Sequence, residues 1–251
     1  MSLYNSPMHR FYAPGFVLQQ DVALPEDEAH HLAKVLRLKE GDLVAVFDGA
    51  GHEAVACVQK ITGRRVVVKA VEKRETAPEP GIAITLAQAL LKSDKMDRVI
   101  RDAVMLGVAA IRPFTSAHTE VPRAAIERGG RQHRWDRTVI SSAKQCGRAV
   151  VPPVLSTTDF QEVLDDERDH ECLMFVEPTH EAGPDRLTSL ETRVPAKATI
   201  LIGPEGGWDP QEIKDAVAVG VTLLTFGRRT LRADAAAAAA IAVLRYVWKD
   251  L

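Results

Sequence analysis

The 251-residue sequence lacks the features that would place the chain in a membrane or an oxidising compartment. Its longest uninterrupted apolar run, 235–244, has ten residues, whereas a membrane-spanning helix needs about 20. The three cysteines, at positions 57, 146 and 172, are far apart and form no CxxC pair, so we expect free thiols and no disulfide framework. Residues 1–10 contain no apolar segment after a basic start, and we therefore expect no secretory signal and a cytoplasmic protein.

The signatures of several catalytic classes are also absent. The eight histidines form no HExxH motif and no pair four residues apart, so we expect no catalytic metal. No Gly-x-Ser-x-Gly elbow occurs, which gives nucleophilic catalysis no support. Glycine-rich segments are present, but none reads Gly-x-Gly-x-x-Gly or ends in Gly-Lys-Ser/Thr, which argues against a dinucleotide or ATP.

Charge is present but segregated along the chain, although the net charge is only −2. Residues 112–148 carry eight Lys and Arg against three carboxylates, a net +5, whereas 157–195 carry eleven carboxylates against three Arg, a net −8. A second basic stretch spans 60–74. Such segregation is typical of a phosphate-binding face on a near-neutral protein. A solvated helix face and a charged hairpin would show the same pattern, so charge alone leaves both interpretations open.

The first part of the chain has the pattern of a small β domain. Residues 76–81 contain two prolines and a glycine and are the best linker candidate. Before them, short runs rich in Val and Ala at 42–48, 53–61 and 65–71 alternate with turn signals, which predicts a β meander in a domain of residues 1–75. One helix is expected over 26–38, with apolar residues at 3–4 spacing. These apolar residues are Ala29, Leu32, Ala33 and Leu36.

After the linker, strands alternate with helices. Strands are expected at 82–87, 108–114, 173–176, 199–202 and 221–226. Helices are expected after a Ser93 cap, around 135–146, after the capping box Asp209-Pro-Gln-Glu212, and over 235–248. This alternation predicts an α/β domain over 76–251 with a parallel sheet covered on both faces.

Two glycine-turned loops are the strongest candidates for a site. Ile202-Gly-Pro-Glu-Gly-Gly-Trp208 and the segment 224–234 each follow a strand and precede a helix, and the second holds Arg228, Arg229 and Arg232. Two such loops at the carboxyl ends of parallel strands would line one crevice, where open α/β sheets bind ligands. A sharp structural turn and a helix N-terminus with solvated arginines are the alternatives. A third segment, 141–148, places Gln145 and Arg148 on one helix face.

Seven short segments, taken in order, carry a resemblance to one family. They are His9–Tyr12, His30–Arg37, Asp48–Gly51, Ala89–Lys92, Ser142–Arg148, Ile202–Gly207 and Gly227–Arg232. Together they resemble the RsmE family, the bacterial small-subunit ribosomal RNA methyltransferases that methylate N3 of a uridine in 16S rRNA. The match spans essentially the whole chain, and its specific part is the combination of the Gly-Pro-Glu-Gly-Gly loop with the later Leu-Arg loop.

The resemblance implies more than composition or periodicity could. It implies a PUA-like β-barrel over 1–75 that binds RNA, followed over 76–251 by a SPOUT α/β domain with a deep trefoil knot. It further implies S-adenosylmethionine (SAM) held bent within the knot, and a homodimer whose interface completes each site. The sequence departs from the family at Ala233-Asp234-Ala235, where the family usually has x-Glu-Thr after Leu-Arg.

Site residues follow from the two glycine loops and this resemblance. The carboxylates Glu177 and Glu205 suit a cofactor with a sulfonium cation. We expect cofactor contacts from Val176, Glu177, Ile202, Gly203, Glu205, Gly206, Gly207, Leu224, Phe226, Gly227, Leu231 and Arg232. We expect RNA contacts from Arg10, Lys92, Arg123, Arg131, Arg134, Gln145 and Arg148.

For catalysis we expect Arg232 to stabilise charge on the uracil, with Arg10 orienting the substrate. A salt bridge from Arg232 to Asp234 or to a partner subunit is the alternative. Two other functions stay open: a non-catalytic RNA-binding or ribosome-assembly module, and methylation of a ribose 2′-hydroxyl by the same fold. A pure binder would not need the 203–207 loop.

Overall fold

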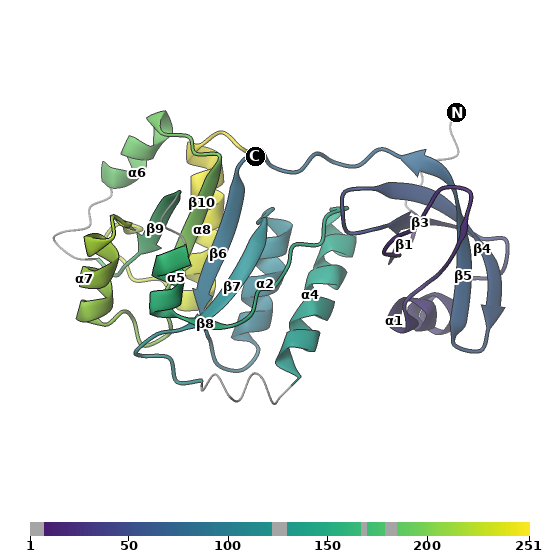
Figure 1. Ribbon diagram of the computed structural model, residues 1–251, viewed down its shortest axis with the longest axis horizontal. Helices are drawn as coiled ribbons and strands as arrows, with labels where there is room; N and C mark the ends of the chain where they lie inside the picture. Colours follow the sequence, from purple (N-terminus) through teal and green to yellow (C-terminus); the bar gives the residue numbers. More distant parts are fainter. Residues whose placement is uncertain (1–7, 122–129, 167–169, 179–184) are drawn as a thin grey trace. The chain divides into compact units, whose positions relative to one another are not determined.

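The computed structural model describes residues 8–121, 130–166, 170–178 and 185–251, and the chain forms two compact units (Figure 1). The first unit ends at Glu79 and also takes in Ala143–Val151; the second unit holds Pro80–Ser142 and Pro152–Leu251. The sequence-based division between residues 75 and 76 did not include this return of 143–151. Backbone bonds explain the return, because Gly51 N–H donates to the carbonyl of Ala149 (3.2 Å) and Val151 N–H to that of Gly49 (2.9 Å).

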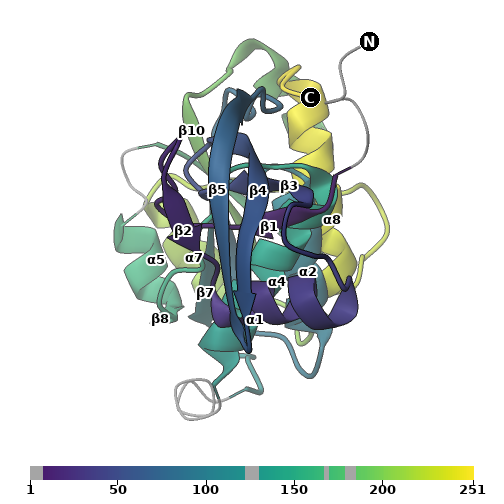
Figure 2. The same cartoon turned by 90° about the vertical axis from the view of Figure 1, so that its right-hand side faces the viewer.

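The first unit is built on a five-stranded sheet of order β1-β3-β4-β5-β2 (Figure 2). The strands are β1 Arg10–Tyr12, β2 Asp21–Ala23, β3 Leu43–Phe47, β4 Glu53–Thr62 and β5 Arg65–Arg74. β3, β4 and β5 are successive antiparallel neighbours, which confirms the predicted meander. β1 and β2 were not predicted, because runs of three residues are too short to show an alternating pattern.

The helix predicted over 26–38 is shorter and less regular than expected. It begins as α1 (Glu26–His30), continues as a π-helical turn η2 (His31–Val35), and Leu36 N–H donates to the carbonyl of His31 (2.9 Å). Ala29 and Leu32 are buried, as the 3–4 spacing predicts, whereas Ala33 and Leu36 are only partly buried. The wider π turn shifts the helical phase, and Ala33 and Leu36 pack at the edge of the core of this unit.

The second unit is built on a six-stranded sheet of order β11-β9-β10-β6-β7-β8 in which every recorded pairing is parallel. The strands are β6 Ala83–Ala89, β7 Ala110–Thr115, β8 Thr158–Asp159, β9 Glu171–Phe175, β10 Lys197–Ile202 and β11 Thr222–Leu224. The prediction of a parallel sheet is therefore confirmed. The carboxyl ends of these strands lie at one edge, and the two glycine-turned loops follow β10 and β11 there.

Helices flank this sheet (Figure 1). They are α2 Lys95–Met105, α4 Arg131–Cys146, α5 Phe160–Asp166, α6 Asp185–Ser189, η3 Leu190–Thr192, α7 Pro210–Ala218 and α8 Ala233–Val247. The capping box of α7 is present as predicted, with Gln211 N–H donating to Asp209 and Asp209 N–H donating to Glu212. The expected Ser93 cap of α2 is wrong, because Asp94 occupies the N-cap and Ser93 has a positive φ of 56°. None of the described helices is long and apolar enough to cross a membrane.

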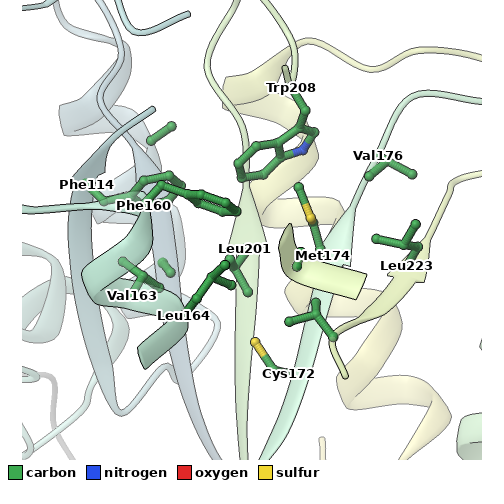
Figure 3. Packing of buried hydrophobic residues seen from close by; sticks show 14 residues of the cluster. Phe114, Phe160, Val163, Leu164, Cys172, Met174, Val176, Leu201, Trp208 and Leu223 are labelled. Carbon is green, nitrogen blue, oxygen red and sulfur yellow. The ribbon is translucent and has the colours of Figure 1, made fainter. Parts of the chain in front are cut away.

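An aromatic cluster anchors the loop that follows β10 (Figure 3). Trp208 stacks on Phe114 with ring centroids 6.0 Å apart and an interplanar angle of 13°, and lies 5.4 Å from Phe160. Its indole N–H donates to the carbonyl of Phe175 at 2.8 Å, so the polar atom of this buried side chain is satisfied. The cluster fixes the end of the 203–208 loop against β7, α5 and β9.

Candidate active site

A pocket of about 320 Å³ opens at the carboxyl ends of β9, β10 and β11, a size in the range of small-molecule sites. Its walls come from the loops that follow these strands, from Lys95 of α2 and from the first turn of α8. This is the edge at which open α/β sheets bind ligands. Eight of the twelve predicted cofactor residues line it: Val176, Glu177, Ile202, Gly203, Glu205, Phe226, Leu231 and Arg232.

The other four predicted cofactor residues, Gly206, Gly207, Leu224 and Gly227, do not line the pocket. The pocket has further lining residues that the sequence analysis did not select: Lys95, Phe175, Pro204, Trp208, Arg229, Thr230, Ala233, Asp234 and Ala236. Lys95 belongs to α2, which is far from both loops in the sequence, so no local pattern could have identified it. The others flank the predicted residues directly.

The glycines of the 203–207 loop are required by the protein's own packing. A Cβ on Gly203 would lie 2.9 Å from Trp208, and a Cβ on Gly207 would lie 2.6 Å from Glu177 Oε1. Gly207 also has a φ of +74°, a conformation that favours glycine. Gly206 faces His118, whose Cβ would lie 3.0 Å from a Cβ built there. A side chain at Gly206 would therefore press against His118, which would have to give by a few tenths of an ångström.

The loop after β7 supports the glycine loop from outside the pocket. His118 Nδ1 lies 3.2 Å from the carbonyl oxygen of Gly207. Ala117 N–H donates to Glu212 Oε1 (2.9 Å), while Glu212 Oε2 accepts from the N–H of Asp209 (3.0 Å). One buried carboxylate thus joins this support to the cap of α7. His118 was not predicted from the sequence, since a lone histidine after a strand carries no recognisable pattern.

Gln88, at the end of β6, supports the same loop from the sheet side. It is fully buried, and its amide nitrogen donates to the carbonyl of Ala89 (3.0 Å) and lies 3.4 Å from those of Ile202 and Gly203. Its Oε1 has no hydrogen-bond partner among the residues that the structure describes. Gln88 therefore positions the start of the glycine loop through backbone carbonyls.

Two of the three carboxylates that line the pocket, Glu177 and Glu205, lie on the loops after β9 and β10. Glu205 Oε1 accepts hydrogen bonds from Lys95 Nζ (3.0 Å) and from the backbone N–H of Lys92 (3.3 Å). Burial raises the pKa of Glu205, but the hydrogen bond from Lys95, those of the backbone N–H groups of Glu205 and Lys92, and the Lys95 charge outweigh it, so the pKa lies below its ordinary value. Glu205 is therefore ionised at neutral pH. Glu177, the second carboxylate, lines the same pocket from the loop after β9.

Arg232 lies at the rim of this pocket, at the N-cap of α8. Its Nε is 3.5 Å from Asp234 Oδ1, so the ion pair named as an alternative is present. The Arg232 side chain is nevertheless 75% exposed. Most of the guanidinium therefore faces solvent beside the pocket, where it can reach a ligand.

Arg10, the second predicted catalytic residue, is fully hydrogen-bonded within the first unit. Its Nε and Nη2 donate to Glu53 Oε2 (3.1 and 2.7 Å), Nη1 donates to the carbonyls of Ala143 and Lys144 (3.0 and 2.9 Å), and Nη2 also donates to that of Arg148 (2.9 Å). A guanidinium has five N–H donors, and all five are used. The geometry thus contradicts a substrate-orienting role for Arg10 and gives it an architectural one.

Most of the predicted RNA-binding residues are also paired within the protein. Arg148 is buried and bonds Glu79, Arg134 pairs with Asp97, and Lys92 pairs with Glu120. Arg131 is partly exposed and Gln145 is exposed, so both stay available, while Arg123 lies outside the described residues. The cations of 112–148 that the structure describes are therefore largely neutralised by carboxylates far away in sequence.

No group of three or more His, Cys, Asp or Glu among the described residues could hold a metal ion.

Comparison with known proteins identifies the family. A family model described as an RNA methyltransferase domain matches residues 78–245, and one described as an RNA methyltransferase PUA domain matches residues 24–71. The ribosomal RNA small subunit methyltransferase E of Synechocystis is 31% identical over 92% of this chain and 74% of its own length.

Solved structures agree with this match. A ribosomal RNA small subunit methyltransferase E from Neisseria gonorrhoeae, bound to S-adenosyl methionine, is 33% identical with a TM-score of 0.84, over 96% of this chain and 98% of that one. A Legionella pneumophila protein in complex with SAM is 26% identical with a TM-score of 0.87, over the same shares of the two chains. The two matching domains, the pocket between two glycine-turned loops and the identity to these relatives agree. The chain belongs to the ribosomal RNA small subunit methyltransferase E family.

Proposed function

We propose that the chain is a SAM-dependent methyltransferase that modifies N3 of a uridine in 16S ribosomal RNA. The observation that carries this proposal is the pocket built by the 203–207 loop and the 224–232 loop at the carboxyl edge of the sheet. The Neisseria gonorrhoeae relative of the same fold binds S-adenosyl methionine. Uridine N3 as the target rests on the resemblance of the two loops to the RsmE family.

The residues of the pocket fit this cofactor. Val176, Ile202, Phe226 and Leu231 provide apolar walls, and Glu177 and Glu205 provide negative charge, which suits a sulfonium and would repel a phosphate. Phe226 is held by a stack on Phe175, with centroids 4.6 Å apart. When bound, SAM supplies a methyl group on a sulfonium leaving group. Gly206, Gly207, Leu224 and Gly227 act on the cofactor only through the loops that they shape.

The protein's part in the reaction is to align the base and stabilise its charge. N3 of uracil lies between two carbonyls, so loss of its proton leaves an imide anion whose charge is spread over both oxygens. A preorganised cation near those oxygens lowers the barrier electrostatically, and alignment of the reacting atoms contributes much of the rest. The exposed guanidinium of Arg232 at the pocket rim serves as that cation in this proposal, without Arg10.

The finer features of the fold belong to the same proposal: a SPOUT domain over 76–251 with a trefoil knot, a PUA-like barrel over 1–75 that binds RNA, a homodimer and a cytoplasmic location. The outer side of α8 supports close packing against a second copy, since it presents Ala235, Ala238, Ala239 and Ala242, and Tyr246 beside them is 74% exposed. Light scattering should give about twice the 27.5 kDa of one chain. A 27.5 kDa particle at micromolar concentration would contradict the dimer.

Two measurements test the function. Calorimetry should show SAM binding and no binding of NAD or ATP; absence of SAM binding would leave a non-catalytic RNA-binding module. Nucleoside analysis of small-subunit RNA treated with the protein and SAM should then show the methyl group on uridine N3. A methyl group on a ribose oxygen would instead assign the 2′-hydroxyl reaction.

A further inference from the structure

The rim of the pocket concentrates cations that the protein does not neutralise. Arg228, Arg229 and Arg232 lie on the segment between β11 and α8, and all three are exposed. Arg232 is near Asp234 (3.5 Å), whereas Arg228 and Arg229 have neither an ion pair nor a hydrogen bond within the described part of the chain. By contrast, Arg112, Arg134 and Arg148 of the basic stretch are paired with carboxylates.

Arg228 and Arg229 lie at the opening of the pocket and not among its inner walls. Arg229 lines the pocket at its mouth, and Arg228 next to it does not line the pocket at all. The pocket walls carry the carboxylates Glu177 and Glu205, which suit a cation. The exposed guanidinium groups of Arg229 and Arg228 therefore place positive charge at the pocket opening and beside it, where they suit an anionic group that stays outside while a neighbouring group enters.

A nucleotide within an RNA strand has this form. A base that enters the pocket to be modified must leave its stack, and its sugar and flanking phosphates stay at the opening. The planar guanidinium fork matches the geometry of phosphate oxygens in a bidentate contact. Adjacent arginines on one loop can each engage one of two successive phosphates.

We propose that Arg228 and Arg229 bind the RNA phosphates that flank the target nucleotide and so hold its base in the pocket. This inference rests on the proposed function and extends it, because it moves the main RNA contact from the 112–148 stretch to the pocket mouth. Arg232 keeps its separate role, which is to stabilise the negative charge on the uracil base.

The test compares two double variants of the full-length protein with equal changes in charge. Arg228→Gln/Arg229→Gln removes both cations at the pocket mouth. Lys197→Gln/Lys249→Gln is the control, because both lysines are exposed and lie away from the pocket, Lys197 at the start of β10 and Lys249 after the end of α8. Binding of protein-free, unmethylated 16S RNA is measured by filter retention over a range of salt concentrations, with SAM affinity measured by calorimetry.

We expect the Arg228/Arg229 variant to bind this RNA roughly ten- to thirtyfold more weakly at low salt, since each lost charged hydrogen bond changes affinity several-fold. The slope of log affinity against log salt should become shallower by about 1.4, at about 0.7 per single-strand phosphate contact. In steady-state methylation the KM for RNA should rise while kcat stays within about twofold. SAM affinity should be unchanged, and the control variant should behave as wild type.

Three results would overturn the inference. An RNA affinity and salt slope equal to those of the control variant would show that both arginines make no contact with the RNA. Weakened SAM binding would assign them to the carboxylate of the cofactor. Normal binding and methylation of protein-free RNA, with a loss confined to assembled small subunits, would assign them to a ribosomal protein. Wild-type protein that neither binds SAM nor methylates RNA would contradict the proposed function itself, before any variant is compared.

Discussion

Arg10 and Arg232 belong to different regions of the molecule and show how differently those regions use charge. In the first unit, all five N–H donors of Arg10 are bonded, and its side chain is 13% exposed. At the pocket rim of the second unit, Arg232 has one long ion pair and is 75% exposed. Both residues lie in segments that carry the family resemblance, yet only one can meet a ligand without breaking the structure.

The role of a charged residue therefore depends on which of its donors are already hydrogen-bonded within the protein. Around Arg10 in the first unit the charges are paired internally: Glu53 bonds both Arg10 and Arg74, and Glu28 bonds Lys144 (2.7 Å). At the pocket mouth the cations outnumber the carboxylates that could neutralise them. The first region therefore uses charge for stability, and the second keeps it for binding and chemistry.

The largest effect is expected from Arg10→Met. This change leaves the buried Glu53 carboxylate with Arg74 alone and removes three bonds to backbone carbonyls at the end of α4. Removing one partner of a buried pair typically costs about 3–5 kcal/mol, so the free energy of unfolding in urea should fall by about that amount. Arg64→Gln is the control, since the Arg64–Glu26 pair is 86% and 70% exposed and should cost less than about 1 kcal/mol. Equal losses in the two variants would remove the contrast between the regions.

Arg232→Ala should leave stability near wild type and lower turnover by roughly 10²–10³-fold, the scale of losing one charge-stabilising donor. Cofactor affinity should be close to wild type, because the backbone of the two loops is unchanged. Single-turnover methylation of the small ribosomal subunit is the measurement, and urea unfolding is the control. Near-normal turnover would show that Arg232 serves only its ion pair with Asp234.

Gly206→Val tests whether the pocket's backbone, unlike its charges, is held by internal contacts. The new side chain would collide with Cβ and the carbonyl of His118, at 3.0 and 3.3 Å from the new Cβ, and overpacking of this kind costs about 1–3 kcal/mol. SAM affinity should fall roughly tenfold. His118→Gly removes one of the two colliding groups and should restore part of the affinity in the double variant. A double variant no better than Gly206→Val would show that the side chain meets the ligand instead.

The smallest effect is expected from a change of pH. It should lower the free energy of unfolding through a different group, and over a different pH range, in each unit. Burial lowers the pKa of His31 in the first unit, and the Lys144 charge lowers it further. The unfolded chain therefore takes up a proton below about pH 6.5 that the folded chain does not, and stability falls as the pH drops from there. Glu205 has a lowered pKa, so its stabilising contribution is complete above about pH 4.3 and is lost as the pH falls through the folded value.

Unfolding measured at about pH 8, 5.5 and 4 separates these contributions. His31→Gln should remove part of the loss between pH 8 and 5.5, and Glu205→Gln should change only the loss below about pH 4.5. The slope from one proton is at most about 1.4 kcal/mol per pH unit. A Glu205→Gln effect that is already pH-dependent between pH 8 and 5.5 would contradict the assignment.

Local pattern in the sequence was sufficient for much of the fold and part of the site. Val- and Ala-rich runs between turn signals predicted β3, β4 and β5, and the Asp209–Glu212 capping box begins α7. These features depend on residues within a few positions of one another, so periodicity and capping chemistry record them directly. The two glycine-turned loops were predicted for the same reason, because each is a short signal between a strand and a helix.

Only the tertiary structure decided which candidate residues are available. Arg10 bonds Glu53, 43 residues away, and carbonyls 133 or more residues away, Arg134 pairs with Asp97, and Gly206 faces His118. No local pattern records such pairings, because they arise when elements distant in sequence pack against one another. The sequence by itself determined the family, the elements and the segments that could form a site, whereas long-range contacts determined that Arg10, Arg134 and Arg148 are used internally and that Arg228, Arg229 and Arg232 face solvent.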